Sequence, residues 1–193
     1  MKNTVLFLTG LSGSGKGYFY DNYLAGGNFY KLISATTRPA RIGEQDGREY
    51  YFRDEAFFEA SKFATLLFVN EAFWKSGDPK WLYGVPENEV FAHPGENLVY
   101  DVIQPRYVRQ MIDWFRAQKS NYNFKVAYFL PPENNFEIAG ARANMQNDMD
   151  VRKNNTCDPI DFLRAGVHPD WFVKSSAAET ILNPKMMRWI RHR

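Results

Sequence analysis

A glycine-rich segment near the start of the chain constrains the fold more than any other feature. Gly10 is followed after four residues by Gly15 and Lys16, and the apolar run of residues 5–8 precedes the segment. An unbroken apolar run of this kind is typical of a strand buried on both faces of a parallel sheet. Residues 17–24 then have the pattern of a helix that ends before Gly26. The segment therefore predicts a strand, a tight loop and a helix in direct succession.

The composition of this loop indicates what it binds. Glycines let successive backbone N–H groups converge on an anion, because no Cβ stands in the way. The helix that follows directs its positive end to the same place. Lys16 would reach the outer phosphates of a nucleoside triphosphate and follow their charge during transfer. The residues expected at these phosphates are Gly10, Ser12, Gly13, Ser14, Gly15, Lys16 and Gly17.

The totals exclude several classes of protein. A length of 193 residues suits one sizeable core, and a net charge of +2 implies no general attraction to nucleic acids or membranes. One cysteine, Cys157, excludes an internal disulfide and a zinc site with several cysteines. No run approaches the ~20 apolar residues of a membrane span. We expect a cytoplasmic protein, a monomer or a homodimer, whose partners are small molecules.

Strands and helices alternate outside the middle of the chain. Further strands are expected over 30–35, 98–102, 125–130 and 171–173, and a last helix after Asn183. The helix that begins at Pro105 carries an apolar stripe at i, i+3, i+4 and i+7, formed by Val108, Met111, Ile112 and Phe115. The pattern predicts an α/β fold with an open, mostly parallel sheet and helices on both faces.

Two segments differ from this pattern. Residues 36–91 carry more charge and more turns, with short strands over 50–52 and 65–69, a helix capped by Asp54, and another beginning at Pro86. Residues 134–160 are rich in Asn, Asp and Arg and poor in large apolar groups. We expect a single unit with a core of residues 1–35, 92–133 and 161–193, an acceptor-binding insertion over 36–91, and a small lid over 134–160.

The insertion carries a recognisable signature. Ser34, Arg38 and Arg41 are followed by a Gly43-Glu44 turn and by the strand of residues 50–52. This segment closely resembles the acceptor-binding signature of guanylate kinases, which are P-loop nucleoside monophosphate kinases. The resemblance covers residues 1–133 well and the remainder loosely, and further matches lie at Glu71, Tyr83-Gly84, Asp101 and Leu130-Pro131-Pro132. It implies the transfer of the γ-phosphoryl group of ATP to GMP, with Mg²⁺.

The chemistry of these residues suits a phosphorylated acceptor. Arg38 and Arg41 can grip a phosphate dianion through charge-assisted bonds, and the hydroxyl groups of Tyr50 and Tyr83 can donate to the same group. By resemblance, the carboxylate of Glu71 would receive the N1–H and exocyclic amine of guanine. Ser34 and Asp101 would add purine contacts. Adenine would leave that carboxylate unpaired, at a cost of roughly 1–3 kcal/mol or more.

The sequence departs from the family pattern at several positions. Gly17 and Tyr18 replace the hydroxyl residue that holds magnesium in other loops of this kind, so the protein ligands of the metal are undefined. Val85 replaces a base-contacting hydroxyl residue, and the link between Glu71 and Tyr83 is longer than usual. The family lid carries two arginines at a fixed spacing. Here only one is at its place, and the candidates for the clamp on the transferring group are Arg142 and Arg152.

Two alternatives remain open from the sequence. The acceptor could be dGMP or a ribose bisphosphate, although the related sugar kinases lack the combination of Arg38, Arg41 and Glu71. The chain could also be a non-catalytic module that binds phosphopeptides through the old acceptor site, but such modules usually have an eroded phosphate loop. His93, His168 and His192 are isolated, and no general base is needed because the acceptor phosphate is already a nucleophile.

Overall fold

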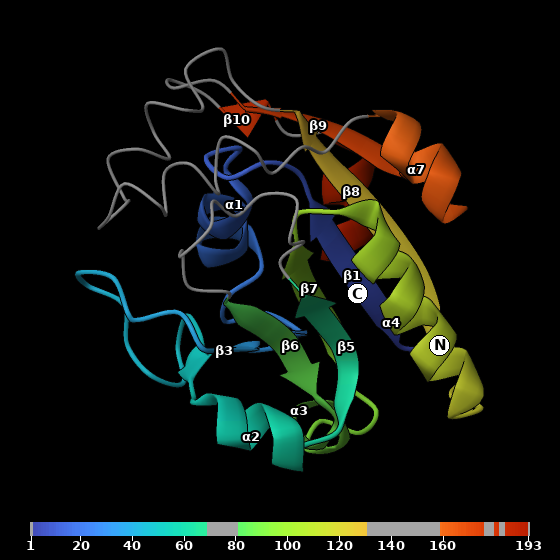
Figure 1. The fold of residues 1–193 in the computed structure, drawn as a ribbon. Coiled ribbons are helices and arrows are strands. Elements are labelled where there is room, and N and C mark those ends of the chain that lie inside the picture. The colour runs from blue at the N-terminus through green and yellow to red at the C-terminus, as the bar shows by residue number, and fades with distance from the viewer. Residues whose placement is uncertain (1, 69–80, 131–158, 176–179, 182–183, 193) are drawn as a thin grey trace.

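The computed structural model of the chain describes residues 2–68, 81–130, 159–175, 180–181 and 184–192 (Figure 1). Strands and helices alternate along these segments. The strands are β1 (Thr4–Thr9), β2 (Phe29–Lys31), β3 (Ala35–Thr36), β4 (Tyr51–Phe52), β5 (Phe63–Phe68), β6 (Leu82–Pro86), β7 (Asn97–Val102), β8 (Asn123–Leu130), β9 (Trp171–Ser175) and β10 (Thr180–Ile181). The helices are α1 (Lys16–Tyr23), α2 (Glu55–Ala60), α3 (Glu87–Phe91), α4 (Pro105–Ala117), α7 (Pro159–Ala165) and α8 (Pro184–Arg191).

Within the described residues, the larger of two sheets has six strands in the order β10-β9-β8-β1-β7-β2. Every neighbouring pair is parallel except β10 and β9, which are antiparallel. The register sets Leu8 of β1 opposite Asp101 of β7. The expected open, mostly parallel sheet is confirmed.

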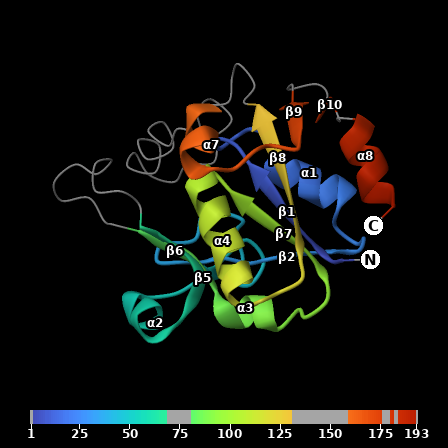
Figure 2. The ribbon, with the colours of Figure 1, turned by 90° about the vertical axis from the view of Figure 1, so that its right-hand side faces the viewer.

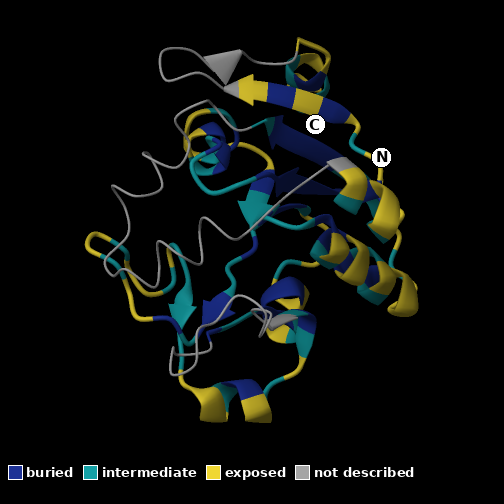
Figure 3. Cartoon of the chain, turned by 45° about the horizontal axis from the view of Figure 1, so that its top comes forward, coloured by how far each residue is buried: buried dark blue, intermediate teal, exposed yellow. Residues whose placement is uncertain are grey.

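Helices cover both faces of this sheet, and each face has its own core. Val5 and Phe7 of β1 pack on the side of α4 and α7, whereas Leu6 and Leu8 pack on the side of α1 and α8 (Figure 2). All four side chains are fully buried. The apolar run of β1 is explained by these two cores. The burial colours show the middle strands of the sheet dark blue, whereas β9 alternates between buried and exposed residues (Figure 3).

The second sheet has the order β4-β3-β6-β5 and lies between β2 and α3 in the sequence. One strand expected over 30–35 is wrong, because residues 29–31 belong to the larger sheet and residues 35–36 to the smaller one. β6 was not expected at all. Its Gly84 is in the strand interior, where a Cβ would lie 2.6 Å from Cδ1 of Phe63 and 2.8 Å from the carbonyl oxygen of Thr65. Close packing of strands, rather than a turn, explains this glycine.

Other expected elements differ in detail. Oδ1 of Asp54 accepts a hydrogen bond from the amide of Phe57 at 2.9 Å, which confirms the cap of α2. Pro86 ends β6 and precedes α3, so it is not the first helical residue. Neither α7 nor β10 was predicted. Only residues 159 and 160 of the expected lid are described, and the division into core, insertion and lid stays a prediction.

Gly84 and Gly17 should respond to replacement by alanine in opposite ways. Gly84→Ala should lower the free energy of unfolding by about 1–3 kcal/mol, because the new methyl group meets backbone and ring atoms. Gly17→Ala, in α1 with no atom within 4 Å of its Cβ, should raise stability by about 0.5–1 kcal/mol. Urea unfolding measures both changes, and equal midpoints for wild type and Gly84→Ala would contradict this account of β6.

Candidate functional site

The loop between β1 and α1 has the backbone conformation that its glycines permit. The φ angles of Gly10, Gly13 and Gly15 are 139°, 82° and 91°. A Cβ on Gly10 would lie 2.5 Å from the carbonyl oxygen of Phe129 on β8, so both the conformation and the space exclude a side chain. The loop leads into α1 at Lys16. Its backbone therefore curves tightly around the positive end of that helix.

Lys16 is almost buried at this loop. Its Nζ donates to the carbonyl oxygens of Gly10 at 2.8 Å and Leu11 at 3.0 Å. The same atom lies 3.7 Å from Oδ1 of Asp101, and 8% of the lysine side chain is exposed. An ammonium group is thus fixed beside the loop by two carbonyl dipoles and one carboxylate.

Asp101 lies near the carboxyl end of β7, beside the carboxyl end of β1. β7 lies beside β1, and the carboxyl ends of both strands meet at the loop. In open α/β sheets, ligands bind at this edge of the strands. Asp101 remains 30% exposed, so its carboxylate can contact Lys16 and still be reached from outside.

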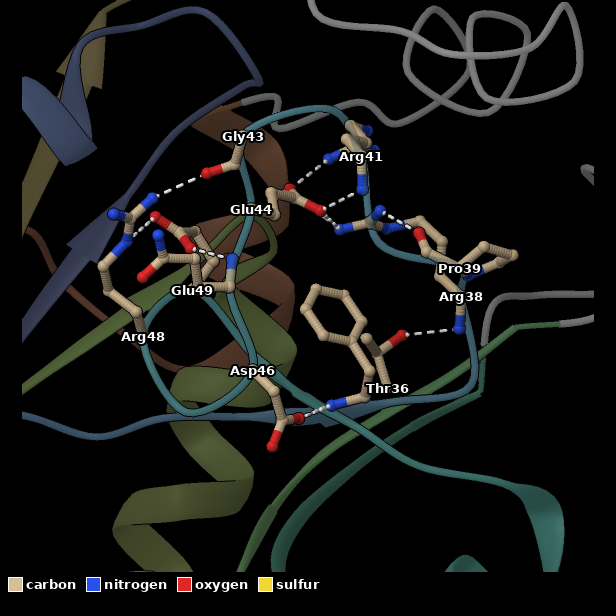
Figure 4. A network of polar contacts seen from close by, with 11 residues as sticks. Thr36, Arg38, Pro39, Arg41, Gly43, Glu44, Asp46, Arg48 and Glu49 are labelled. Carbon is tan, nitrogen blue, oxygen red and sulfur yellow. Dashed lines mark hydrogen bonds and ion pairs between the residues drawn. The ribbon is translucent and has the colours of Figure 1, made fainter.

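A second cluster of charge lies on the loop that follows β3 (Figure 4). The carboxylate of Glu44 accepts from Nη2 of Arg38 through both oxygens, at 3.0 and 2.9 Å. It also accepts from the amide of Arg41 at 2.7 Å and from its Nη1 at 3.3 Å. Two guanidinium groups, which would otherwise repel one another, are thereby held side by side by one carboxylate. We call Arg38, Arg41 and Glu44 the arginine clamp.

Arg38 is the buried member of the clamp, with 2% of its side chain exposed. Its Nη1 donates to the carbonyl oxygen of Pro39 at 2.6 Å. Its guanidinium lies over the rings of Tyr50 at 5.3 Å and Phe52 at 5.8 Å. The Nε atom is buried and has no hydrogen-bond partner among the described residues. A buried donor without a partner costs about 1–3 kcal/mol, which an anion bound at this atom would recover.

Tyr50 connects the clamp to the phosphate loop. Its ring meets that of Tyr83 edge-on, with 5.8 Å between the centroids. Burial raises the pKa of the Tyr50 hydroxyl above its ordinary value; Tyr83 and Asp101 raise it further, and the guanidinium groups of Arg38 and Arg41 act in the opposite direction. Coulombic effects fall with distance, so all these groups lie near one hydroxyl. Asp101 therefore acts on both Lys16, which it contacts, and the hydroxyl of Tyr50.

The structure therefore brings together many of the residues singled out in the sequence. Lys16 contacts Asp101, Arg38 and Arg41 share Glu44, and the ring of Tyr50 lies against both Arg38 and Tyr83. Ser34 lies in the segment between β2 and β3, and its carbonyl oxygen accepts from the amide of Tyr51. Glu71, Arg142, Arg152 and Cys157 lie outside the described residues. Their assigned roles stay predictions.

Sequence reasoning missed the part that Glu44 plays in the clamp. The residue was noted only as half of a Gly-Glu turn. Its amide donates to the carbonyl oxygen of Arg41 at 3.0 Å, and its side chain turns back to the amide of the same residue. A carboxylate three residues after an arginine is a detectable signal for such a turn. The stacking of Arg38 on Phe52 had no comparable signal.

The residues of the site fit a magnesium ion that enters together with ATP. No cluster of three or more His, Cys, Asp or Glu side chains exists among the described residues. Gly17 has no hydroxyl group, and Asp101 is the carboxylate in contact with Lys16. Mg²⁺ commonly takes ligands from water, substrate phosphates and one or two carboxylates rather than from an all-protein cage. Asp101 can serve as such a carboxylate.

No helix within the described segments combines the length and the apolar character needed to cross a membrane. No protein-family model matches the sequence.

Curated relatives share sequence with parts of the chain. It is 45% identical over 60 residues to guanylate kinase of Thermus thermophilus, across 31% of this chain and 27% of that protein. Identity is 36% over 92 residues with guanylate kinase of Carboxydothermus hydrogenoformans, across 47% and 42% of the two chains. With guanylate kinase of Rickettsia typhi it is 32% over 137 residues, across 68% and 62%. The chain spans less than two thirds of the length of these relatives.

A solved structure has the same fold. The crystal structure of guanylate kinase from Anaplasma phagocytophilum matches with a TM-score of 0.52 and 16% sequence identity. The match covers 99% of this chain and 84% of that one. It therefore extends to both sheets, beyond the regions matched by sequence.

Removal of the clamp carboxylate tests whether the cluster is an anion site. Glu44→Ala should lower the free energy of unfolding by about 3 kcal/mol, because it leaves buried Arg38 without its counter-ion. Glu49→Ala, which breaks an exposed pair with Arg48, should cost less than about 1 kcal/mol. Added inorganic phosphate should raise the Tm of Glu44→Ala more than that of wild type, since it supplies the missing anion. An equal rise in all three proteins would contradict the expectation that phosphate replaces the carboxylate of Glu44 beside the arginines.

Proposed function

Because the chain belongs to the guanylate kinase family, we propose that it transfers the γ-phosphoryl group of ATP to GMP. The observation that carries the proposal is a pair of cationic centres, Lys16 beside Asp101 and the arginine clamp over Tyr50, with Asp101 near enough to raise the pKa of the Tyr50 hydroxyl. One is made of backbone amides around Lys16, and the other is the arginine clamp. Two phosphate-bearing substrates could occupy them at the same time.

The donor would bind along the loop between β1 and α1. Its phosphates would accept hydrogen bonds from the loop amides at the positive end of α1. Lys16 would exchange its present carbonyl partners for the outer phosphate oxygens. A lysine that is already ordered loses little conformational freedom on binding, which favours catalysis by positioning. Magnesium bound with ATP would neutralise part of the charge on the β- and γ-phosphates.

The acceptor would place its phosphate at the clamp. Nε of Arg38, the guanidinium of Arg41 and the hydroxyl of Tyr50 are the donors that would hold it. The raised pKa of Tyr50 keeps its hydroxyl protonated at neutral pH, so that it can donate to a phosphate oxygen. An acceptor phosphate needs no general base, and electrostatic stabilisation by fixed donors then supplies most of the catalysis.

Three further roles rest on the sequence alone. Glu71 would select guanine by accepting its N1–H and exocyclic amine, and Arg142 and Arg152 would stabilise charge on the transferring group. Closure of the insertion and the lid over the substrates would exclude water and limit hydrolysis of ATP. Val85 is fully buried, so the hydroxyl missing at this position leaves an apolar contact in the smaller sheet.

A kinase of dGMP or of a ribose bisphosphate, and a non-catalytic binding module, are the alternatives. The module is disfavoured by Lys16, which is held at an intact glycine loop. Coupled ATP consumption with GMP, dGMP, AMP, UMP and ribose bisphosphate separates the three functions. We expect turnover with GMP above all others. Retained GMP binding without any turnover would favour the module, and turnover with the sugar alone would favour the sugar kinase.

Substitutions at the two centres should have separable effects on kinetics. Lys16→Met should lower kcat by about 10²–10³-fold, because it removes a donor aimed at developing charge. Arg38→Lys should raise KM for GMP by roughly 10–100-fold, since an ammonium cannot replace the bidentate, stacked guanidinium.

Arg48→Lys is the matched control for Arg38→Lys, because Arg48 pairs with Glu49 at the exposed surface. It should leave both kinetic constants within about twofold of wild type. Equal increases in KM for GMP in Arg38→Lys and Arg48→Lys would show that the clamp does not belong to the acceptor site.

A further inference from the structure

Two short segments connect the smaller sheet to the larger one. The chain leaves through residues 32–34 and returns through α3 into β7 (Figure 1). These segments lie close together, because β2 pairs with β7 and the amide of Leu32 donates to the carbonyl oxygen of Val99 at 2.8 Å. Contacts at these two segments therefore influence how the arginine clamp lies relative to the phosphate loop, together with the hydrogen bonds that join β5 to Tyr100 of β7 and Gln110 of α4.

One buried carboxylate joins these segments. Glu89 of α3 is 7% exposed. Its Oε1 accepts from the hydroxyl of Tyr30 at 2.9 Å and from the amide of Ile33 at 3.0 Å. Its Oε2 accepts from the hydroxyl of Tyr51 at 3.0 Å. One oxygen therefore binds the larger sheet and the outgoing segment, and the other binds β4 of the smaller sheet.

The three donors are neutral, and no ion pair joins Glu89 to a cation in the described part of the chain. Loss of the carboxylate would leave three donors to find other partners, so the contact is expensive to break. On the side of the larger sheet, the ring of Tyr30 stacks on His93, just after α3, with 3.3 Å between the centroids. The stacking thus holds Tyr30, one of the three hydrogen-bond partners of Glu89, in place.

On the side of the smaller sheet, the hydrogen bond from Tyr51 connects Glu89 to the support of the clamp. Tyr51 stands between Tyr50 and Phe52, the two rings under the guanidinium of Arg38. It also pairs with Ala35 across the smaller sheet. A shift of Tyr51 would therefore move the support of Arg38.

We propose that Glu89 is a positioning residue for phosphoryl transfer, whose carboxylate links the support of the arginine clamp to the larger sheet and so sets where the clamp lies relative to the phosphate loop. The proposal rests on the proposed function for its kinetic consequence. Glu89 contacts neither Lys16 nor the clamp, so it acts only through Tyr30, Ile33 and Tyr51. Misplacement of the reacting groups by about 1 Å can cost ~10²-fold in rate.

Kinetics and binding should therefore respond differently to its removal. Glu89→Ala should lower kcat by about 10–100-fold, while the Kd values of ADP alone and of GMP alone stay within about threefold of wild type. Glu89→Gln should recover most of kcat, since its oxygen can keep the bonds from Tyr30 and Ile33 while the hydroxyl of Tyr51 turns to accept from the side-chain amide. Ser120 lies just after α4, and Ser120→Ala removes a 2.7 Å hydrogen bond to the carbonyl oxygen of Phe115. It should leave kcat and both Kd values unchanged.

Tyr51→Phe keeps the experiment decisive where Glu89→Ala does not fold. It removes one hydroxyl and leaves the bonds of Glu89 to Tyr30 and Ile33 intact. We expect kcat to fall roughly tenfold, the equivalent of one charged hydrogen bond. Unchanged kcat in a folded Glu89→Ala or Tyr51→Phe, or a change confined to KM for GMP, would overturn the proposal.

A distance measurement separates this proposal from the proposed function. Spin labels on cysteines at exposed Asp21 of α1 and Glu59 of α2, with Cys157 replaced by serine, report the distance between the two parts. The distribution should broaden or shift in Glu89→Ala and stay unchanged in Ser120→Ala, whether or not wild type turns over GMP. An unchanged distribution in Glu89→Ala would overturn the positioning role, and an inactive wild type would overturn the proposed function alone.

Discussion

Positive charge that is buried before any substrate arrives must be compensated by the protein itself, and the candidate site is built around this requirement. Lys16 is held by two carbonyl oxygens and Asp101. Arg38 and Arg41 are held by Glu44. In each case the compensation leaves donors for an anion and fixes the cation in advance. The cost of ordering these side chains is therefore met during folding rather than during binding.

The two sheets divide this task. The parallel strands of the larger sheet bring Asp101 to the same edge as the glycine loop, because β7 lies directly beside β1. The smaller sheet supports the clamp from below, with Tyr50 and Phe52 under Arg38. In the described part of the chain, residues 32–34 and α3 connect the two sheets, and the carboxylate of Glu89 joins these connections to β4 beside the clamp.

The sequence predicted local features well where one residue type had one physical reason. Gly10 and Lys16 identify the loop, the apolar run of β1 identifies a buried strand, and the stripe of Val108, Met111 and Phe115 identifies the buried face of α4. Prediction failed where an element depends on contacts with residues far away in the sequence. The break between β2 and β3 follows from a change of sheet, and β6 is marked only by a glycine that makes room for Phe63.

The same limit applies to the site. Glu44 could have been assigned to the clamp from its spacing to Arg41, since both lie in one turn. Glu89 could not, because its three donors are 38–59 residues away in the sequence. A carboxylate on a short amphipathic helix gives no hint that it is buried. The effect of Asp101 on Tyr50 likewise depends on β7 of the larger sheet and on the residue that precedes β4 of the smaller one.

The most direct test of two facing anion sites is the affinity of a ligand that spans both, adenosine and guanosine joined through five phosphates, measured by calorimetry. If one molecule fills the loop and the clamp together, it should bind at least about 10²-fold more tightly than either ATP or GMP. Lys16→Met and Arg38→Lys should each abolish most of that gain. Binding no tighter than that of ATP alone would contradict the account, because the two cationic centres would then not face one another.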